Sequence, residues 1–366
     1  MTASDRTALL RLLYPERMQR LSITRAAVAH PPFRISQAEA AARIGQVSGE
    51  PRKAAAVAKG SQIHERALCL PPEQISALGA IEERNRLYAR HAPALALEAA
   101  TKALRAPLSA SPRGDRDVRF LASCSCTGYM VPGWDIGLVQ ELDLPCDTVR
   151  LPITQAGCAG GVLSLARAGD HLRWRPGAAL VVACEICSLA FQRSSDEGNL
   201  TSALIFADGA GAALLESATP PGALEIVDSV SLLSPAPASV LGFQLTDGGF
   251  APQLSRELVS VLPPATARAL DRLLAPHGLV PPDIEYWLLH PGGSRILTQI
   301  EHSLAIDRCR TRWSWDSLAA CGNTSSAAIF DVLRRYLNDP AAPDGWGVVA
   351  AFGPGVSIEL LLVRRC

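Results

Sequence analysis

Three residue types that together can transfer an acyl group stand far apart in the chain. Cys158 lies among glycines in the segment Gln-Ala-Gly-Cys-Ala-Gly-Gly, His290 begins His-Pro-Gly-Gly, and Asn323 lies in Cys-Gly-Asn-Thr-Ser-Ser-Ala. A cysteine thiolate accepts an acyl group as a thioester. A neutral imidazole N–H and an amide N–H can together hold the negative oxygen of an enolate or a tetrahedral intermediate. These residues predict acyl transfer with carbon–carbon bond formation.

Small residues after Cys158 and Asn323 are typical of loops that open a helix. A helix N-terminus offers unpaired backbone N–H groups and a positive dipole end, which lower a thiol pKa and can form part of an oxyanion hole. We expect Gly157, Gly160 and Gly161 to allow a tight turn and the close approach of an acyl group. The pattern predicts a reactive thiolate at Cys158.

The elements that must position these residues alternate between apolar strands and helices. This alternation predicts a mostly parallel α/β architecture. A capping box at residues 36–39 predicts the start of an early helix, which Gly45 ends. The predicted strands cover residues 118–123, 148–153, 178–183, 212–216, 224–229, 286–289, 348–352 and 357–363.

Two proline-rich loops, at residues 218–222 and 234–237, divide the chain of 366 residues near residue 220. A chain of this length exceeds the usual single core. On both sides of the boundary, a buried strand enters a glycine turn and a small-residue loop later opens a helix. We therefore predict two related halves that face one pocket, with the nucleophilic cysteine in residues 1–220 and the histidine and asparagine in residues 221–366.

The composition excludes several classes of partner. The formal net charge is zero, charged residues make up 19% of the chain, and no dense basic run suits a phosphate backbone, which argues against nucleic acid. The first residues lack a signal-peptide pattern, and no apolar stretch is long enough to span a bilayer. We expect a soluble, cytoplasmic protein with no membrane partner.

The ten cysteines lie mostly in apolar runs. In a cytosolic chain of this size they are expected to be reduced thiols that pack as small hydrophobic side chains. Either of the pairs Cys124/Cys126 and Cys184/Cys187 could contribute zinc ligands. Neither has a second pair of ligands at the spacing of a zinc finger. We predict no metal site.

In order and spacing, these motifs resemble the chalcone synthase-like, or type III polyketide synthase, family of the thiolase superfamily, and its bacterial branch in particular. The resemblance covers nearly the whole chain and is strongest from residue 118 onward. It implies that Cys158 is the acyl-accepting cysteine and that His290 and Asn323 are catalytic. It also implies the five-layered αβαβα sandwich of the thiolase fold, in two related halves, and a homodimer.

The resemblance assigns further residues to the walls of the active site. Phe206 and Phe243 resemble two gatekeeping phenylalanines between a CoA tunnel and the cavity. Phe352 and Gly353 begin a Phe-Gly-Pro-Gly turn that resembles the family's cavity-lining C-terminal loop. The family has a glycine before this turn, where Ala351 stands here.

Several predicted substrate-binding positions differ from those of a chalcone-forming enzyme. Cys126 and Cys187 stand where threonines are usual, and Ala190 replaces another threonine. Val131 fills the place of a methionine that crosses the dimer interface, and Ser325 is a further predicted contact. Smaller, more apolar walls favour a flat or long aliphatic chain over a hydroxylated aromatic starter.

The cations that could bind CoA phosphates are few. Lys59, Arg66 and Arg295 are the candidates, although the basic stretch that serves this purpose in plant enzymes is thin here.

We therefore predict decarboxylative Claisen condensation of malonyl-CoA onto an acyl-CoA starter held on Cys158, followed by cyclisation to a pyrone or resorcinol. We expect a fatty acyl starter and no cofactor beyond the CoA thioesters. One alternative is a single condensation of the kind catalysed by ketoacyl-ACP synthase III, but no basic surface helix is evident for docking an acidic carrier protein. A second alternative, a non-catalytic acyl-binding protein on the same fold, conflicts with the intact catalytic residues.

Overall fold

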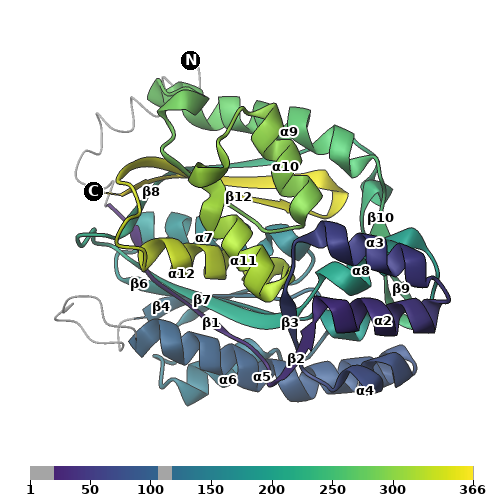
Figure 1. The fold of residues 1–366 in the computed structure, drawn as a ribbon. Helices are drawn as coiled ribbons and strands as arrows, with labels where there is room; N and C mark the ends of the chain where they lie inside the picture. The colour runs from purple at the N-terminus through teal and green to yellow at the C-terminus, as the bar shows by residue number, and fades with distance from the viewer. Residues whose placement is uncertain (1–19, 106–117, 366) are drawn as a thin grey trace.

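The computed structural model describes residues 20–105 and 118–365 (Figure 1). Its strands are β1 (Ser22–Ala29), β2 (Phe33–Ser36), β3 (Glu65–Leu68), β4 (Val118–Cys124), β5 (Val149–Ile153), β6 (Ala178–Ile186), β7 (Asp208–Glu216), β8 (Leu224–Leu233), β9 (Leu241–Thr246), β10 (Gly249–Leu254), β11 (Tyr286–Leu289), β12 (Gly345–Gly353) and β13 (Ser357–Arg365). Its α-helices are α2 (Gln37–Ser48), α3 (Pro51–Ser61), α4 (Pro72–Ala77), α5 (Ile81–Arg105), α6 (Trp134–Glu141), α7 (Gly160–Trp174), α8 (Glu197–Ile205), α9 (Leu258–Leu274), α10 (Ser294–Ser303), α11 (Arg312–Cys321) and α12 (Ala328–Leu337).

Nine of these strands form one mixed sheet in the order β11-β12-β13-β8-β1-β7-β6-β4-β5. Only the pairs β4–β5, β4–β6 and β11–β12 are parallel, whereas the other neighbours in this sheet are antiparallel. The prediction of a mostly parallel sheet is therefore wrong. Short connections are one reason, because the turn at Pro354–Val356 returns the chain directly from β12 to β13, whereas a parallel neighbour needs a long crossover.

The halves of the sheet lie on opposite sides of α7 and α12 (Figure 1). Val162 and Leu165 of α7 share a buried core with Ile329 and Phe330 of α12 and with strands from both halves. Side chains of α5 pack on the outer face of one half, and those of α9 and α10 pack on the outer face of the other. The predicted αβαβα sandwich of five layers is thus confirmed.

The early helix begins where the sequence predicts but ends later. The Ser36 side chain caps α2 by accepting a hydrogen bond from the Glu39 backbone N–H at 3.2 Å. Gly45 lies inside the helix, and Gly49, with a φ of 72°, ends it. A Cβ on Gly45 would lie 2.7 Å from Pro51 Cα, so this glycine serves the packing of α2 against α3.

Every predicted strand coincides with an observed one, although most are longer than predicted. Strand β7 begins at Asp208, four residues before the predicted start at residue 212. The small residues at its beginning have little strand propensity of their own, and they are in the sheet because they pair with β1. Strand β1 and the β9–β10 hairpin were not predicted from the sequence. The hairpin matters for the site because it carries Phe243.

The close contact between α7 and α12 depends on glycine. A Cβ on Gly161 would lie 2.4 Å from the Ser326 carbonyl oxygen and 2.6 Å from Ile329 Cγ2. We expect Gly161→Ala to separate the two helices and lower the free energy of unfolding by about 1–3 kcal/mol. Chemical denaturation measures this change.

Gly137→Ala is the matched control, because Gly137 is also helical and nothing lies within 4 Å of an added Cβ. This change should be neutral or stabilise the protein by about 0.5–1 kcal/mol. Equal stability of the two variants would contradict the packing argument.

Candidate active site

The starts of α7 and α12 bring Cys158 and Asn323 together. Cys158 lies in the 3-10 turn Gly157–Ala159 that leads into α7, and Asn323 lies just before the turn Ser325–Ala327 that leads into α12. The Cys158 Sγ is 3.6 Å from Ser325 Oγ and 4.0 Å from Asn323 Nδ2. A thiol, a hydroxyl and an amide N–H thus meet at one point between the halves of the sheet.

The glycines around Cys158 make room for protein atoms and not for an acyl group. Gly157 has a φ of 51°, and its Cβ would lie 2.5 Å from Pro354 Cδ. A Cβ on Gly160 would lie 2.3 Å from Cys124 Sγ. The expected tight turn is present, but these glycines bring the C-terminal loop and β4 against the turn that carries the cysteine.

The Asn323 amide is fixed at both ends. Its Oδ1 accepts a hydrogen bond from the Ser325 backbone N–H at 2.8 Å, and its Nδ2 donates to the Gly292 carbonyl oxygen at 3.2 Å. Ser325 reaches this position with a φ of 52°. The amide N–H side of Asn323 therefore faces Cys158.

His290 follows β11, where its backbone N–H donates to the Ala350 carbonyl oxygen at 2.7 Å. The residue is only 1% exposed, and neither ring nitrogen has a hydrogen-bond partner among the described residues. The imidazole lines the same cavity as Cys158, so its N–H is available to a bound molecule.

Burial favours the neutral forms of both groups. It raises the pKa of the Cys158 thiol to about 11, against the effect of the hydrogen bonds with Ser325 and Asn323. Burial also lowers the pKa of His290 to about 3. The predicted lowering of the thiol pKa is therefore wrong, because desolvation outweighs the effect of the helix terminus.

A cavity of about 710 Å³ contains the three candidate catalytic residues. Phe352 and Gly353 form part of its wall, as the sequence predicts. Gly353 is pressed against the cysteine turn, since its Cβ would lie 2.7 Å from Ala159 Cβ.

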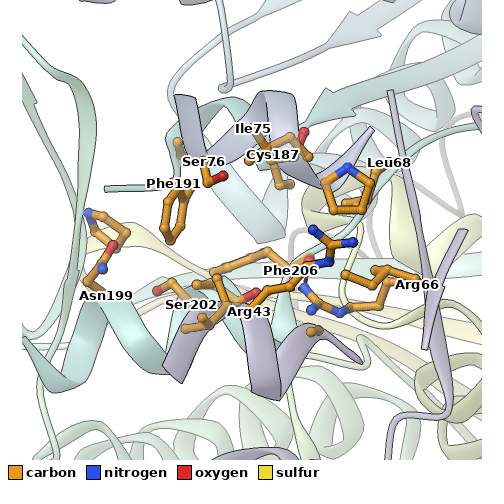
Figure 2. Close-up of a pocket in the computed structure, with 18 of the residues that line it drawn as sticks. Arg43, Arg66, Leu68, Ile75, Ser76, Cys187, Phe191, Asn199, Ser202 and Phe206 are labelled. Carbon is orange, nitrogen blue, oxygen red and sulfur yellow. Dashed lines mark hydrogen bonds between the residues drawn. The ribbon is translucent and has the colours of Figure 1, made fainter. Parts of the chain in front are cut away.

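A second, smaller cavity of about 80 Å³ lies between α2, α4 and α8 (Figure 2). Cys187, Ala190 and Ser325 line it, as predicted, together with apolar side chains such as Ile75 and Phe191. The other apolar residues of its wall include Ile35, Ile44, Val47, Leu68, Pro72 and Pro252.

Phe206 and Phe243 belong to the walls of both cavities. Their ring centroids are 6.4 Å apart. Phe250, which the sequence did not single out, packs edge-on against Phe243 with the centroids 6.4 Å apart. The two predicted gate residues thus stand between the catalytic cavity and the smaller one.

Two predicted substrate contacts lie elsewhere. Cys126 lines neither cavity but sits behind the wall, with its Sγ 3.7 Å from Ser325 Oγ. Val131 is 78% exposed and also lines neither cavity, so its role across a dimer interface stays a prediction.

The three CoA candidates differ in position. Arg295 is exposed and lines the larger cavity. Lys59 is exposed in the last turn of α3, beside Gly60, which lines the same cavity. Arg66 is only 3% exposed and donates hydrogen bonds to backbone carbonyls, so the prediction that it binds CoA phosphates is wrong.

Glu185 is a buried carboxylate that the sequence analysis missed. It accepts hydrogen bonds from the Cys126 backbone N–H at 3.0 Å, from Thr127 Oγ1 at 2.8 Å and from Ser326 Oγ. Burial raises the pKa of Glu185. The sequence signal for this site is a single acidic residue in the apolar run 181–186. An acid in a buried strand must be surrounded by hydrogen-bond donors, because an unpaired buried charge is costly.

Within the described ranges, no group of three or more His, Cys, Asp or Glu side chains could hold a metal ion. No helix in the same part of the chain has both the length and the apolar character needed to cross a membrane.

Family models match most of the chain. The model of the N-terminal domain of chalcone and stilbene synthases matches residues 58–220, and that of the C-terminal domain matches residues 225–366. The 1,3,6,8-tetrahydroxynaphthalene synthase of Streptomyces peucetius subsp. caesius is 32% identical over 94% of this chain and 93% of its own length. The α-pyrone synthesis polyketide synthase-like Pks18 of Mycobacterium tuberculosis is 28% identical over 90% of this chain and 88% of its own.

The fold matches solved structures of the same kind. The crystal structure of 1,3,6,8-tetrahydroxynaphthalene synthase from Streptomyces coelicolor, a bacterial type III polyketide synthase, aligns with a TM-score of 0.86 at 27% identity. The alignment covers 94% of this chain and 99% of that one. Both domain models match, a bacterial relative is similar over 93% of its length, and the five-layered fold is present. This chain therefore belongs to the chalcone and stilbene synthase family and is a type III polyketide synthase, an acyltransferase-type enzyme.

Proposed function

We propose that Cys158, His290 and Asn323 carry out decarboxylative condensation of malonyl-CoA onto a starter acyl group. The observation that supports this most is their arrangement, because one cavity is lined by a thiol, an amide N–H and an imidazole that has no hydrogen-bond partner within residues 20–105 and 118–365. Acyl transfer needs a nucleophile, and enolate formation needs donors at the developing negative oxygen. The site supplies both.

The reaction begins at Cys158. The thiol proton passes to His290, and the opposite charges then attract because the imidazole is buried. The thiolate attacks the thioester carbonyl of the starter, the bond from that carbonyl to the CoA sulfur breaks, and CoA leaves with the proton from His290. His290 returns to the neutral form, with an N–H free to donate.

Carbon–carbon bond formation follows. The bond between the α-carbon of malonyl-CoA and its carboxylate breaks, CO₂ leaves, and the electron pair becomes an enolate whose oxygen His290 and Asn323 hold. The enolate carbon attacks the thioester on Cys158, and the cysteine sulfur departs as thiolate. The lengthened chain, now on CoA, can return to Cys158 for another round before it cyclises.

The surroundings suit CoA thioesters as the only carriers. Arg295 and Lys59 are the cations we assign to the CoA phosphates, and Phe206 and Phe243 act as the gate between the cavities. We propose that the enzyme works as a cytoplasmic homodimer with no further cofactor. Malonyl-CoA and an acyl-CoA are its substrates.

We propose a fatty acyl starter, because the smaller cavity beyond the gate is walled mainly by apolar side chains. Each methylene buried there contributes roughly 0.8 kcal/mol, whereas a phenolic hydroxyl left without a partner costs about 1–3 kcal/mol. The product is then a pyrone or a resorcinol with an alkyl substituent. One similar protein is named for α-pyrone synthesis.

Removing the nucleophile tests the first step. Cys158→Ala should abolish chain extension without unfolding the protein, because the half-buried thiol contributes little packing. In the parent enzyme incubated with acyl-CoA, mass spectrometry of peptides should find the acyl group on Cys158. An adduct on another cysteine, for example the exposed Cys309, would refute the assignment.

Removing the oxyanion donors tests the second step. His290→Ala and Asn323→Ala should each slow malonyl-CoA decarboxylation by about a hundredfold or more, the usual scale for one such donor. Because the two donors act on the same oxygen, the double variant should be little slower than either single one. Decarboxylation near the parental rate in Asn323→Ala would exclude Asn323 from this step.

Filling the smaller cavity tests the starter. Ala190 is 8% exposed and lines this cavity, so Ala190→Phe should shorten the longest fatty acyl-CoA accepted or reduce the number of extensions. Product masses from a ladder of acyl-CoAs measure the change, and an unaltered rate of malonyl-CoA decarboxylation is the control for folding. An unchanged product profile, or a parent enzyme that uses only malonyl-CoA, would refute the fatty acyl proposal and leave the family unaffected.

A further inference from the structure

A buried arginine holds the end of the helix that carries the gate. Arg66 Nη1 donates to the carbonyl oxygens of Ala203 at 2.8 Å and Phe206 at 2.6 Å (Figure 2). Its Nε donates to Gln37 Oε1 at 3.2 Å, and Gln37 Nε2 donates to the Leu204 carbonyl oxygen at 2.7 Å. The last carbonyls of a helix have no intrahelical partner, and these two side chains satisfy three carbonyls at the end of α8.

The same end of α8 is bonded to the backbone of the catalytic asparagine. The Asn323 N–H donates to the Ile205 carbonyl oxygen, and the Ala207 N–H donates to the Asn323 carbonyl oxygen, both at 2.9 Å. Phe206 and Asn323 thereby form an isolated parallel bridge. A shift of the α8 terminus would move the gate ring and the catalytic amide together.

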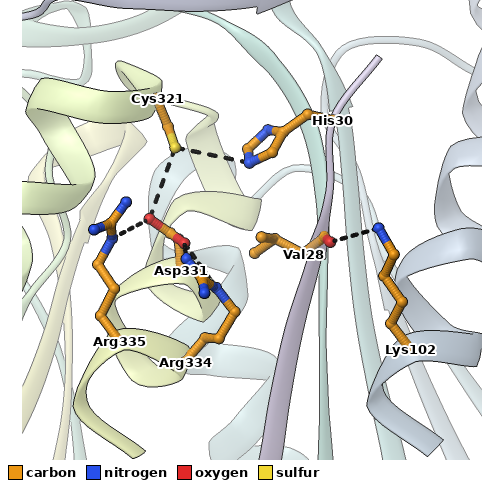
Figure 3. Close-up of polar contacts among 7 residues, drawn as sticks. All are labelled: Val28, His30, Lys102, Cys321, Asp331, Arg334 and Arg335. Carbon is orange, nitrogen blue, oxygen red and sulfur yellow. Dashed lines mark hydrogen bonds and ion pairs between the residues drawn. The ribbon is translucent and has the colours of Figure 1, made fainter. Parts of the chain in front are cut away.

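The residues before Asn323 are held on two sides. On one side, a Cβ on Gly322 would lie 2.9 Å from Arg66 Cγ, so the backbone lies directly on the arginine. On the other side, the Cys321 Sγ is 3.7 Å from His30 Nε2 and 3.7 Å from Asp331 Oδ2 (Figure 3). These contacts hold Cys321 on one side of the segment. Arg66 holds Gly322 on the side that faces the gate.

The charge of Arg66 is maintained in spite of its burial. Desolvation lowers its pKa to about 10, and the Asp208 carboxylate opposes this shift, so the guanidinium is protonated at neutral pH. A guanidinium presents its donors in a rigid planar fork, whereas a lysine ammonium is a single point on a flexible stem. Because Nη1 and Nε lie in one rigid plane, the guanidinium fixes the two carbonyls bound to Nη1 relative to Gln37, which is bound to Nε.

We propose that Arg66 is a positioning residue for decarboxylation, which sets the place of the Asn323 amide by fixing the end of α8. The inference rests on the proposed role of Asn323. Oxyanion donors must lie within hydrogen-bond distance of the oxygen in the transition state, and a displacement of about 1 Å can cost about a hundredfold in rate. A small movement at Arg66 is therefore sufficient to slow the reaction.

The test compares Arg66→Lys with Arg84→Lys. Arg84 is a matched control because it is 6% exposed and its Nη1 donates to the carbonyl oxygens of Leu189 at 2.6 Å and Phe191 at 2.8 Å. Acylation of Cys158, followed by intact-protein mass, counts the functional sites in each sample. Malonyl-CoA decarboxylation is then expressed per acylated site, and thermal unfolding is measured in parallel.

We expect both variants to be less stable than the parent. Only Arg66→Lys should have a lower rate of malonyl-CoA decarboxylation per acylated site, by about tenfold, and the change should be in kcat rather than in KM. Arg66→Met, which removes all three hydrogen bonds, should lose more; if it does not fold, the lysine variant alone decides. A parental rate per site in Arg66→Lys, or an equal loss in Arg84→Lys, would overturn the proposal. Asn323→Ala in the same assay separates the two ideas, because a parental rate there refutes the proposed function itself.

Discussion

The active site depends on the direct contact between the starts of α7 and α12. Gly161 lacks the side chain that would keep these helix starts apart, and the Ser326 carbonyl oxygen occupies the space. Since each helix start is preceded by a catalytic candidate, this contact brings Cys158 within 4.0 Å of the Asn323 amide. The halves of the sheet on either side bury both helices, so the core of the fold also determines the geometry of the site.

Burial of the catalytic groups gives the site its reactivity. His290 is buried and neither of its ring nitrogens has a hydrogen-bond partner in the part of the chain that the structure describes, and desolvation favours the neutral Cys158 thiol. A substrate oxygen that becomes negative in this cavity can accept hydrogen bonds from the buried His290 N–H and from the Asn323 amide, so its stabilisation is greater in the transition state than in the ground state.

The sequence analysis predicted correctly those features that depend on neighbouring residues. It was wrong about features that depend on contacts with residues elsewhere in the fold. The Ser36 cap follows from neighbouring residues, whereas Gly45 looked like a helix end because the partner that requires it, Pro51, comes later in the chain. The order and spacing of the motifs around Cys158, His290 and Asn323 identified the family. Neither the inward direction of Arg66 nor the partners of Glu185 could be predicted, because backbone carbonyls and hydroxyls from distant segments decide both. The division into two related halves stays a prediction.

The chemistry and the choice of starter are controlled by different parts of the molecule. The catalytic groups lie on the central helices, whereas much of the smaller cavity's wall comes from α2 and α4 at the edge of the fold. Residues there can change in size without altering the contact between α7 and α12, so the cavity can vary while the catalytic groups stay in place. Arg66 is the exception, because it lines the smaller cavity and also holds the backbone on which Asn323 depends. A substitution that reshapes the wall at this position therefore also disturbs the reaction.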